Sequence, residues 1–533
     1  MRTGIVAATL AFVAGWWLGG QKTEIASPRS TPARPAPLPT PAQAPGTTTA
    51  SRGSELARSV CGTCHLVPEP ALLTKTEWAH HVLPEMARWL GLEAVDFESR
   101  KDGRLLQAAG IYPPSPVISV EDWLAIWDHY VSAAPTRPVP PPPKPATDGV
   151  TPWFRARKMN FHTGLPAISL VKIDAPRRQL LVGDAFASLL GVVDMHGAVS
   201  RRVRVPGAPV HAAVGERGLH VTLIGQIYPS DALDGAVGYV AHQQGDGAEI
   251  VLDHLRRPVA TAVGDVNADG RADLVVCAFG NRLGRLSWFE AMDDGSFEEH
   301  PLLEQPGVAH AELRDLNHDG RPDLVVLRAQ AREGISLFLN EGAGRFTHRP
   351  VVEQHPAFGY TSLVIADVNG DGHDDLLTAN GDNGDHPTPH RSYHGVRLLT
   401  GDGQGRFQQT WFHPLEGAYK ALAADFDADG DVDIAAIAYF PDFTASQVEA
   451  ALVFENQGRL RFVPRALPEA DAGRWMVMDA GDLDGDGDTD LALGSYLAGP
   501  TTIPVPSAVR ERWRTAGAAV LLLENVSRHA GAR

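Results

Sequence analysis

The chain has 533 residues, too many for a single ordinary core, and its 44% hydrophobic content is enough to build folded domains. Its net charge of −17 comes from five short loops that carry 20 aspartates, and subtracting those charges leaves about +3. The rest of the chain is nearly neutral, which argues against a nucleic-acid partner, and three cysteines are too few for a disulfide framework.

Residues 1–20 carry the pattern of an export segment. Met1 and Arg2 precede an apolar run that ends at Gly20, with Trp16 and Trp17 near its end. This segment is either a cleaved signal peptide or, because tryptophans suit a membrane interface, a retained membrane anchor. Residues 21–53 are rich in Pro, Ser and Thr and predict an extended linker. We therefore expect the remainder to be exported to the periplasm or cell surface, where it is either free or tethered to the inner membrane.

Residues 54–135 have a helical pattern that leads into the motif Cys61-Gly-Thr-Cys64-His65. In such a motif the two thiols form thioethers with haem vinyl groups, and the imidazole of His65 binds the iron. The motif predicts one covalent haem c. A zinc site would need a second ligand pair, but the remaining cysteine, Cys277, lies in a distant apolar run and is expected to be a buried free thiol.

Met86 is the only methionine between the haem motif and the end of this region, so we predict it as the sixth iron ligand. His80 or His81 would instead give bis-histidine ligation. A final helix is expected after Ser119, which pairs with Asp122 as an N-cap, and it carries an apolar stripe of Trp123, Ile126, Trp127 and Tyr130. A small all-α domain with first and last helices around a haem resembles class I cytochrome c, and this resemblance implies electron transfer.

A Pro-rich linker is expected at residues 136–150, followed by a nine-residue motif that occurs five times. The motif is D-x-[DN]-x-D-G-x-x-D, and its first residues lie 50, 52, 58 and 57 positions apart. Oxygen ligands at positions 1, 3, 5 and 9 around a tight glycine turn predict calcium binding. The expected calcium ligands are Asp265, Asn267, Asp269, Asp273, Asp315, Asn317, Asp319, Asp323, Asp367, Asn369, Asp371, Asp375, Asp425, Asp427, Asp429, Asp433, Asp482, Asp484, Asp486 and Asp490.

Strand-like apolar runs follow each loop, which distinguishes these units from EF-hands. The units resemble the FG-GAP/VCBS repeats of integrin-like β-propellers over roughly residues 260–527. Strand-like runs at 179–184 and 219–225 lack ligand loops and fit two further blades. We therefore expect an all-β propeller over residues 151–529, with seven blades as the first choice and six or eight as alternatives. Its last strand, 519–525, is expected to pair with a strand from the start of the domain.

Three functions remain open at this stage. The first is an electron-transfer protein that exchanges electrons with a redox protein or a small-molecule donor or acceptor, while its propeller binds a protein or polymer. The second is a haem-dependent oxidoreductase with its substrate site on the propeller, and the third is a cell-surface adhesion module. We assign no catalytic residues. An insert at 385–395 with three histidines is expected to be an irregular surface loop or a metal or substrate site, and Tyr439 and Tyr496 are expected to face one side.

Overall fold

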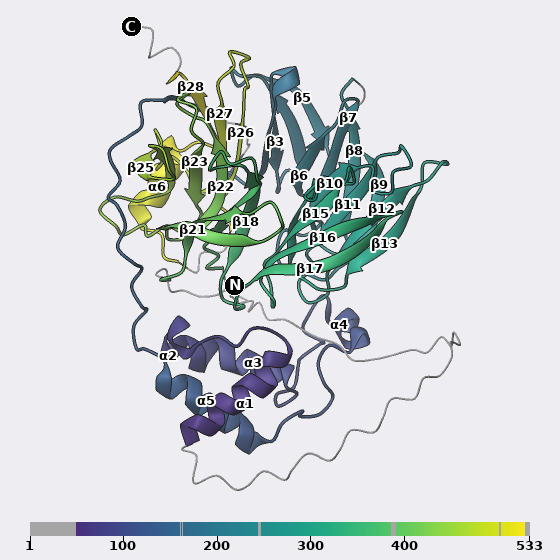
Figure 1. Cartoon of the computed structure of the whole chain (residues 1–533), viewed down its shortest axis with the longest axis vertical. Helices are drawn as coiled ribbons and strands as arrows, with labels where there is room; N and C mark the ends of the chain where they lie inside the picture. Colours follow the sequence, from purple (N-terminus) through teal and green to yellow (C-terminus); the bar gives the residue numbers. More distant parts are fainter. Residues whose placement is uncertain are drawn as a thin grey trace, which may run out of the picture.

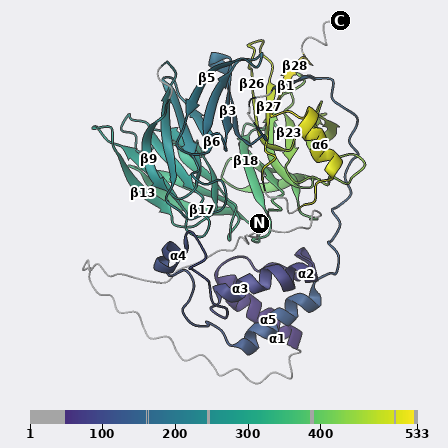
Figure 2. The same cartoon turned by 180° about the vertical axis from the view of Figure 1, so that it is seen from behind.

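A computed structural model describes residues 49–159, 161, 164–243, 247–384, 391–499 and 503–527. The predicted export segment and nearly all of the first linker lie outside these residues. Within the described ranges, no helix combines the length and apolarity needed to cross a membrane. The described chain forms a small helical body below a larger ring of sheets, and an extended segment joins the two (Figures 1 and 2).

The helical domain is built around a buried aromatic and aliphatic core that includes Trp78, Ile126 and Tyr130. Its first helix lies so close to its last that a Cβ at Gly53 would sit 2.1 Å from the carbonyl oxygen of Ala125. Its elements are α1 (Thr49–Val60), η1 (Cys61–Thr63), η2 (Pro70–Leu72), α2 (Lys75–Glu77), the π-turn η3 (Trp78–Val82), α3 (Leu83–Trp89), α4 (Gly103–Ala109) and α5 (Val120–Ala133).

The sequence predicted the start of the last helix of this domain correctly but not the start of the first. Helix α5 begins where predicted, because the Ser119 hydroxyl accepts the backbone N–H of Asp122 at 3.0 Å. Helix α1 begins at Thr49, before the predicted boundary of 54. Its early turns are held by Arg52, which bonds to the carboxylates of Glu121 and Asp122 on α5. Residues 49–53 therefore have the composition of a linker, but tertiary contacts hold them in a helix.

Seven four-stranded antiparallel sheets form the ring, which confirms the predicted seven-bladed propeller. The first two blades, which carry no ligand loop, are β2 (Ile168–Asp174), β3 (Gln179–Asp184), β4 (Leu189–Val193) and β5 (Val199–Arg204), then β6 (Pro209–Val214), β7 (Gly218–Leu223), β8 (Gly235–Ala241) and β9 (Glu249–Leu255). A short 3-10 turn, η4 (Ala175–Arg177), joins β2 to β3. The predicted pair of blades without calcium loops is confirmed.

Five blades follow, each with a predicted ligand loop between its first and second strands. They are β10 (Pro258–Gly264), β11 (Asp273–Ala278), β12 (Arg285–Ala291) and β13 (Phe297–Leu303); β14 (Val308–Arg314), β15 (Asp323–Arg328), β16 (Gly334–Gly342) and β17 (Arg345–Glu353); β18 (Tyr360–Ala366), β19 (Asp375–Asn380), β20 (Gly395–Gly401) and β21 (Phe407–Pro414); β22 (Ala418–Ala424), β23 (Asp433–Ala438), β24 (Ala451–Asn456) and β25 (Phe462–Ala466); and β26 (Trp475–Gly481), β27 (Asp490–Ser495) and β28 (Val520–Asn525).

Strand β1 (Phe154–Met159) closes the ring as the outer strand of the last blade. It pairs antiparallel with β28, from Phe154 opposite Asn525 to Met159 opposite Val520, so the predicted closure is confirmed. The helix α6 (Ser507–Ala516) lies between β27 and β28. This pairing removes the exposed edge that an open seventh blade would leave.

The second strand of each ligand-loop blade is buried along its whole length because neighbouring blades cover both of its faces. In β11, Val275 and Cys277 pack toward the fourth blade, whereas Leu274 and Val276 pack toward the second. Cys277 is fully buried, as predicted, and burial raises the pKa of its thiol. The motif's apolar run is thus the core of the blade.

The Pro-rich segment lies along the side of the propeller without regular secondary structure (Figure 1). The Lys144 ammonium donates to the carbonyl oxygen of Pro414 at 2.9 Å, and the backbone N–H of Asp148 donates to that of Pro464 at 2.8 Å. These bonds fasten the spacer to the fifth and sixth blades. The linker between the helical domain and the propeller is therefore held against the propeller surface by hydrogen bonds.

Candidate functional site

The Cys61–His65 motif lies directly after α1, in the 3-10 turn η1 and the bend that follows it. The His65 ring is 7% exposed, and its Nδ1 lies 2.8 Å from the carbonyl oxygen of Leu66. Because a carbonyl oxygen only accepts, Nδ1 carries the proton and Nε2 keeps its lone pair. Burial lowers the pKa of His65, so the imidazole is neutral at pH 7. A neutral imidazole with one oriented nitrogen is the form that binds a metal.

A cavity of about 920 Å³ adjoins this motif, and Cys61, His65, His81 and Met86 line it together. Its walls in the helical domain are otherwise mostly apolar and include Leu72, Leu73, Trp78, Val82, Leu83 and Ile126. Cys64 lies beside it and is part-exposed, with its Sγ 3.6 Å from the Thr63 hydroxyl. Thiols, a neutral imidazole and a thioether around an apolar space are the donor set and surroundings that suit haem c.

The three candidates for a sixth ligand are not placed alike. Met86 on α3 and His81 in η3 both line the cavity, whereas His80, also in η3, is not among its lining residues in the described chain. Met86 also packs partly buried against the domain core. The π-turn η3 and helix α3 thus place His81 and Met86 at the cavity that His65 also lines.

The same cavity continues from the helical domain into the mouth of the propeller's central channel. All seven inner strands contribute to it near the end where each carries a β-bulge, for example at Lys420 of β22 and His211 of β6. Tyr439 and Tyr496 line this part, and the Tyr439 hydroxyl donates to the carbonyl oxygen of Tyr496 at 3.1 Å. The prediction that these two segments face one side is therefore confirmed.

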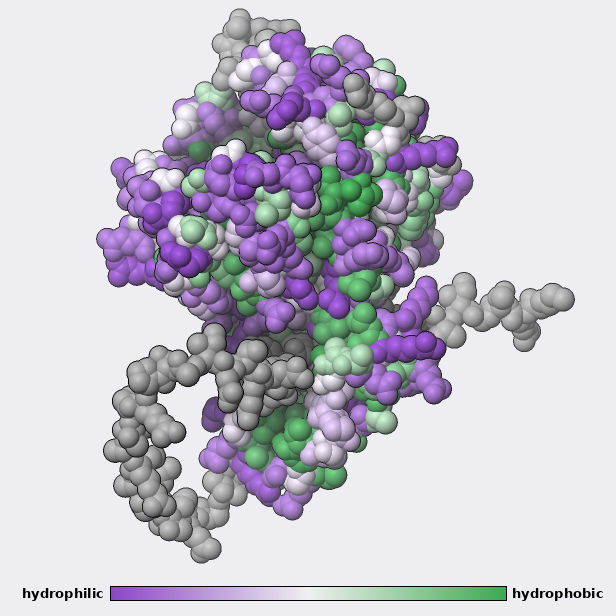
Figure 3. All heavy atoms as spheres, turned by 90° about the vertical axis from the view of Figure 1, so that its right-hand side faces the viewer, coloured by the Kyte–Doolittle hydropathy of each residue, from purple (hydrophilic) through white to green (hydrophobic). Residues whose placement is uncertain are grey.

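Buried polar contacts hold the helical domain on this face of the propeller. Arg391 forms an ion pair with Glu77 at 2.7 Å, and their side chains are 4% and 3% exposed. Arg282 donates to the Tyr112 hydroxyl at 2.6 Å and lies 3.4 Å from a carboxylate oxygen of Glu85. In the space-filling view the two bodies meet at a narrow waist (Figure 3).

A propeller residue, Arg332, contacts the Cys61–His65 motif directly. The Arg332 guanidinium, in the loop between β15 and β16, donates to the carbonyl oxygens of Cys64 at 3.2 Å and Thr63 at 3.3 Å. These carbonyls end a short helical turn, where a cation is favourable. Sequence reasoning missed Arg332 because 268 residues separate it from Cys64, and no local pattern marks the residue.

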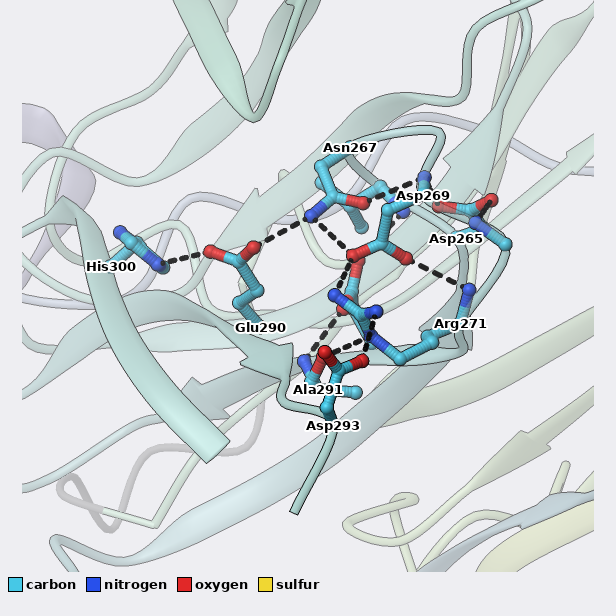
Figure 4. Close-up of polar contacts among 11 residues, drawn as sticks. Asp265, Asn267, Asp269, Arg271, Glu290, Ala291, Asp293 and His300 are labelled. Atoms are coloured by element: carbon cyan, nitrogen blue, oxygen red, sulfur yellow. Dashed lines mark hydrogen bonds and ion pairs between the residues drawn. The ribbon is translucent and has the colours of Figure 1, made fainter. Parts of the chain in front are cut away.

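The first ligand loop shows how the predicted calcium residues lie (Figure 4). The Asp265 carboxylate accepts the backbone N–H groups of Asp269 at 3.1 Å and Gly270 at 2.9 Å, which winds the loop around it. Arg271 forms an ion pair with Asp269 and also donates to Asp293 at 2.8 Å. An arginine thus neutralises one expected ligand, and Arg321 pairs with Asp319 in the same way in the second loop.

The aspartate at position 9 has a structural role that the spacing did not reveal. Asp273 accepts the backbone N–H of Val266 at 2.9 Å with one oxygen and that of Ala291 at 2.9 Å with the other. The same double contact, from the loop to the third strand, recurs at Asp323, Asp375, Asp433 and Asp490. In each ligand-loop blade this carboxylate therefore ties the loop and the second strand to the third strand, and its remaining lone pairs are what it can offer to a cation.

The fourth and fifth loops gather their carboxylates most closely. Oxygens of Asp425, Asp427 and Asp433 lie within 4.8 Å of one another, as do oxygens of Asp482, Asp484 and Asp490. Burial and nearby carboxylates raise the pKa of Asp427 to about 6 and that of Asp433 to about 7. Such crowding is unfavourable unless a cation or a proton neutralises it. These loops carry Asp431 and Asp488 where the first two carry arginine.

The histidine insert is only partly within the described residues, because 385–390 lie outside them. The described end differs from the predicted surface loop, since His394 is 2% exposed and packs beside Tyr393. Burial lowers the pKa of His394 and lowers that of neighbouring His355 to about 4. These two rings belong to the propeller wall that faces the helical domain.

The FG-GAP-like repeat family matches residues 265–326 and 315–378. No curated protein matches the chain. Among solved structures, a complex of yeast (S. cerevisiae) Dbp5 with Nup159, Gle1, IP6 and ADP aligns at a TM-score of 0.42 and 11% identity, covering 71% of this chain and 97% of that one. Hydrazine synthase of Kuenenia stuttgartiensis aligns at 0.42 and 13%, covering 63% and 94%.

A further aligned structure is a functionally unknown protein from Desulfotomaculum acetoxidans, at a TM-score of 0.38 and 10% identity, covering 56% of this chain and 85% of that one. The chain thus carries FG-GAP-like repeats within a seven-bladed β-propeller. That architecture indicates a binding or ligand-interaction module.

Proposed function

We propose that this protein is an exported c-type cytochrome that transfers electrons through one haem c attached to Cys61 and Cys64. The observation that carries the proposal is the oriented, neutral His65, whose ring lines one apolar cavity with Cys61 and Met86. His65 is the proximal ligand in this proposal and Met86 the sixth, with His81 as the alternative. When bound, the haem would supply one-electron oxidation and reduction.

The chain's own groups have defined tasks in this proposal. The Leu66 carbonyl fixes the tautomer and orientation of His65, and the apolar walls exclude water from the iron. Arg332 holds the motif's terminal carbonyls and places a positive charge beside it. A redox protein, or a small molecule in the channel mouth, would be the electron donor or acceptor. Residues 1–20 would direct export and, if retained, provide the membrane anchor.

A second function, a haem-dependent oxidoreductase with its substrate on the propeller, is favoured by one observation. The cavity that holds His65 is continuous with the channel mouth, so a bound molecule would lie next to the haem without crossing bulk solvent. A simple docking protein does not need this continuity. The adhesion function has no such support, because it gives the Cys61–His65 motif no task.

Calcium is the second proposed cofactor, bound by up to five loops. The crowded carboxylates of the fourth and fifth loops support it most directly. In the first and second loops an arginine already neutralises the position-5 aspartate, so weaker binding follows there. Bound calcium would stabilise the propeller because it binds the folded loops only.

The test is expression of the full chain in a host competent for cytochrome maturation, followed by an absorption spectrum of the denatured, alkaline pyridine adduct. One covalent haem per chain is expected, and none in a Cys61→Ser/Cys64→Ser variant. Met86→Ala should abolish the near-infrared charge-transfer band of a methionine-ligated ferric haem, whereas persistence of that band would reassign the sixth ligand. Colourless protein with two alkylatable thiols would refute the cytochrome proposal.

A further inference from the structure

The propeller part of the cavity contains polar groups that the haem would not use. Asp382 follows β19, while Tyr419 and Lys420 are consecutive on β22 in the neighbouring blade. Asp382 is open to the cavity, yet the surrounding protein desolvates it and raises the pKa of its carboxyl group. Burial also raises the pKa of Tyr419, and the nearby Asp382 carboxylate adds to that shift.

Each of these side chains has hydrogen-bonding capacity left over. One Asp382 oxygen accepts the backbone N–H of Gly384 at 2.8 Å, and within the described chain the other oxygen has no partner. The Tyr419 hydroxyl and the Lys420 ammonium likewise have no hydrogen-bond partner among described residues. An acceptor and two donors therefore line the same cavity, and a few polar groups in a largely apolar cavity are how small-molecule sites are commonly built.

The charges around the cavity decide what kind of molecule fits. The lining residues include four cations, Lys172, Arg257, Arg391 and Lys420, and four anions, Glu312, Glu333, Asp382 and Asp479. The two signs balance, and several groups are already paired, such as Lys172 with Asp479 at 3.1 Å. An anionic ligand would meet Asp382, and a cationic ligand would meet Arg257 and Lys420. A neutral ligand is repelled neither by Asp382 nor by Arg257 and Lys420.

The side walls of this part are aromatic. Tyr419 and Tyr439 lie with ring centroids 5.3 Å apart, and Tyr439 and Phe440 lie 4.8 Å apart. Tyr228 also lines the cavity and is 57% exposed. Aromatic faces with a polar edge bind the flat side of a ring whose rim carries hydroxyl groups.

From this geometry we propose that the channel mouth binds a neutral ring compound bearing hydroxyl groups. Asp382 would accept a hydrogen bond from one hydroxyl, the Tyr419 hydroxyl would donate another, and the side chains of Tyr419 and Tyr228 would contact the ring. The site deepens the proposed function by naming the ligand class of the propeller, and it rests on that function only for its redox consequence. Sugars and hydroquinones share this chemistry and are distinguished by the test below.

The experiment is calorimetric titration of the full chain with cellobiose, hydroquinone, glucuronate and glucosamine, each at the same concentration. Binding of cellobiose or hydroquinone at least tenfold tighter than that of both charged compounds supports the proposal and tells a sugar from a phenol. Equal or tighter binding of either charged compound overturns the neutral assignment. Absence of binding by both neutral compounds overturns the site.

Variants test the residues. Asp382→Asn and Tyr419→Phe should each weaken binding of the neutral ligand about tenfold, because the first replaces a charged hydrogen-bond acceptor by a neutral one and the second removes a donor. Tyr228→Ala should weaken ligand binding severalfold. The Tyr228 side chain is exposed, so its removal should not disturb folding. Asp253→Asn on the outer strand β9, whose side chain is 70% exposed, is the matched control and should change nothing. Unaltered affinity in all three site variants would overturn the proposal.

The haem content of the same samples separates the two proposals. Haem-loaded protein that binds neither neutral compound refutes only the ligand site. Protein without haem that binds one of them refutes only the cytochrome. The absorption spectrum and the titration therefore test the haem proposal and the ligand-site proposal independently.

Discussion

The ion pair between Arg391 and Glu77 should contribute much of the stability of domain docking. Both side chains are almost fully buried, at 4% and 3% exposure, and one comes from the propeller while the other comes from the helical domain. Glu77 also accepts the backbone N–H and hydroxyl of Thr74, at 2.8 and 2.9 Å, which completes a capping box. Substitution of Arg391 by Met keeps the volume and removes the cation from a buried carboxylate.

The expected cost of Arg391→Met is about 3–5 kcal/mol, the usual range when one partner of a buried pair is removed. It should appear as a loss of docking, with earlier melting of the helical domain and faster hydrogen exchange at the facing propeller loops. Differential scanning calorimetry and hydrogen exchange on the full chain measure both effects. The double variant Arg391→Met/Glu77→Gln should recover part of the lost stability, since a neutral glutamine replaces the buried carboxylate that has lost its arginine partner.

The matched control is Arg52→Met, which breaks pairs with Glu121 and Asp122 on the domain surface. These side chains are 29–77% exposed, so water and salt screen the pairs and the cost there should be much smaller than that of Arg391→Met. If Arg391→Met costs no more than Arg52→Met, the buried pair does not hold the domains together, and the docking argument is wrong.

Three further predictions follow from other contacts. Arg332→Gln should lower the haem reduction potential in a spectroelectrochemical titration, because removal of a nearby positive charge favours the oxidised iron; an unchanged potential would count against this contact. Chelation should lower the melting temperature of the propeller, and calorimetry should find two tight calcium sites that are lost in Asp427→Asn and Asp484→Asn; five equal sites would contradict the role given to the loop arginines. Burial lowers the pKa of His413 to about 3, so the unfolded chain binds the extra proton between about pH 6.5 and 3. His413 alone should therefore contribute a fall in stability of about 1.4 kcal/mol per pH unit on acidification within this range, and His413→Phe should remove that contribution from the slope in denaturant titrations.

The repeat pattern predicted the propeller well because each motif encodes a local unit. The ligand loop, its glycine turn and the buried strand after it lie within about fifteen residues, so position in the chain determines position in the blade. Ring closure by β1 and β28 followed from the need to cover an edge. The position-9 aspartate looked like a simple ligand because its two backbone partners, one of them on the third strand, cannot be read from spacing.

The site between the domains was far less visible in the sequence. His65 and Met86 are local to one motif and one helix, but Arg332 reaches the site from a loop of the fourth blade, and Asp382 and Arg391 reach it from one loop of the fifth. Loops carry no periodicity, and a pairing across some 300 residues leaves no signature in a single sequence. Their roles follow from where the helical domain is docked, which is a property of the whole fold.

Docking also gives the proposed haem-binding residues two kinds of surroundings. Cys61, His65 and Met86 line the shared cavity, whereas Leu66, next to His65, is not among its described lining residues and is 45% exposed. A ligand in the channel mouth and a protein partner at the surface would therefore approach the haem from different directions. The propeller covers the cavity, while Leu66 stays at the surface. In the proposed function, an electron taken from a bound molecule would then leave near Leu66, and the two partners would not compete for a single face.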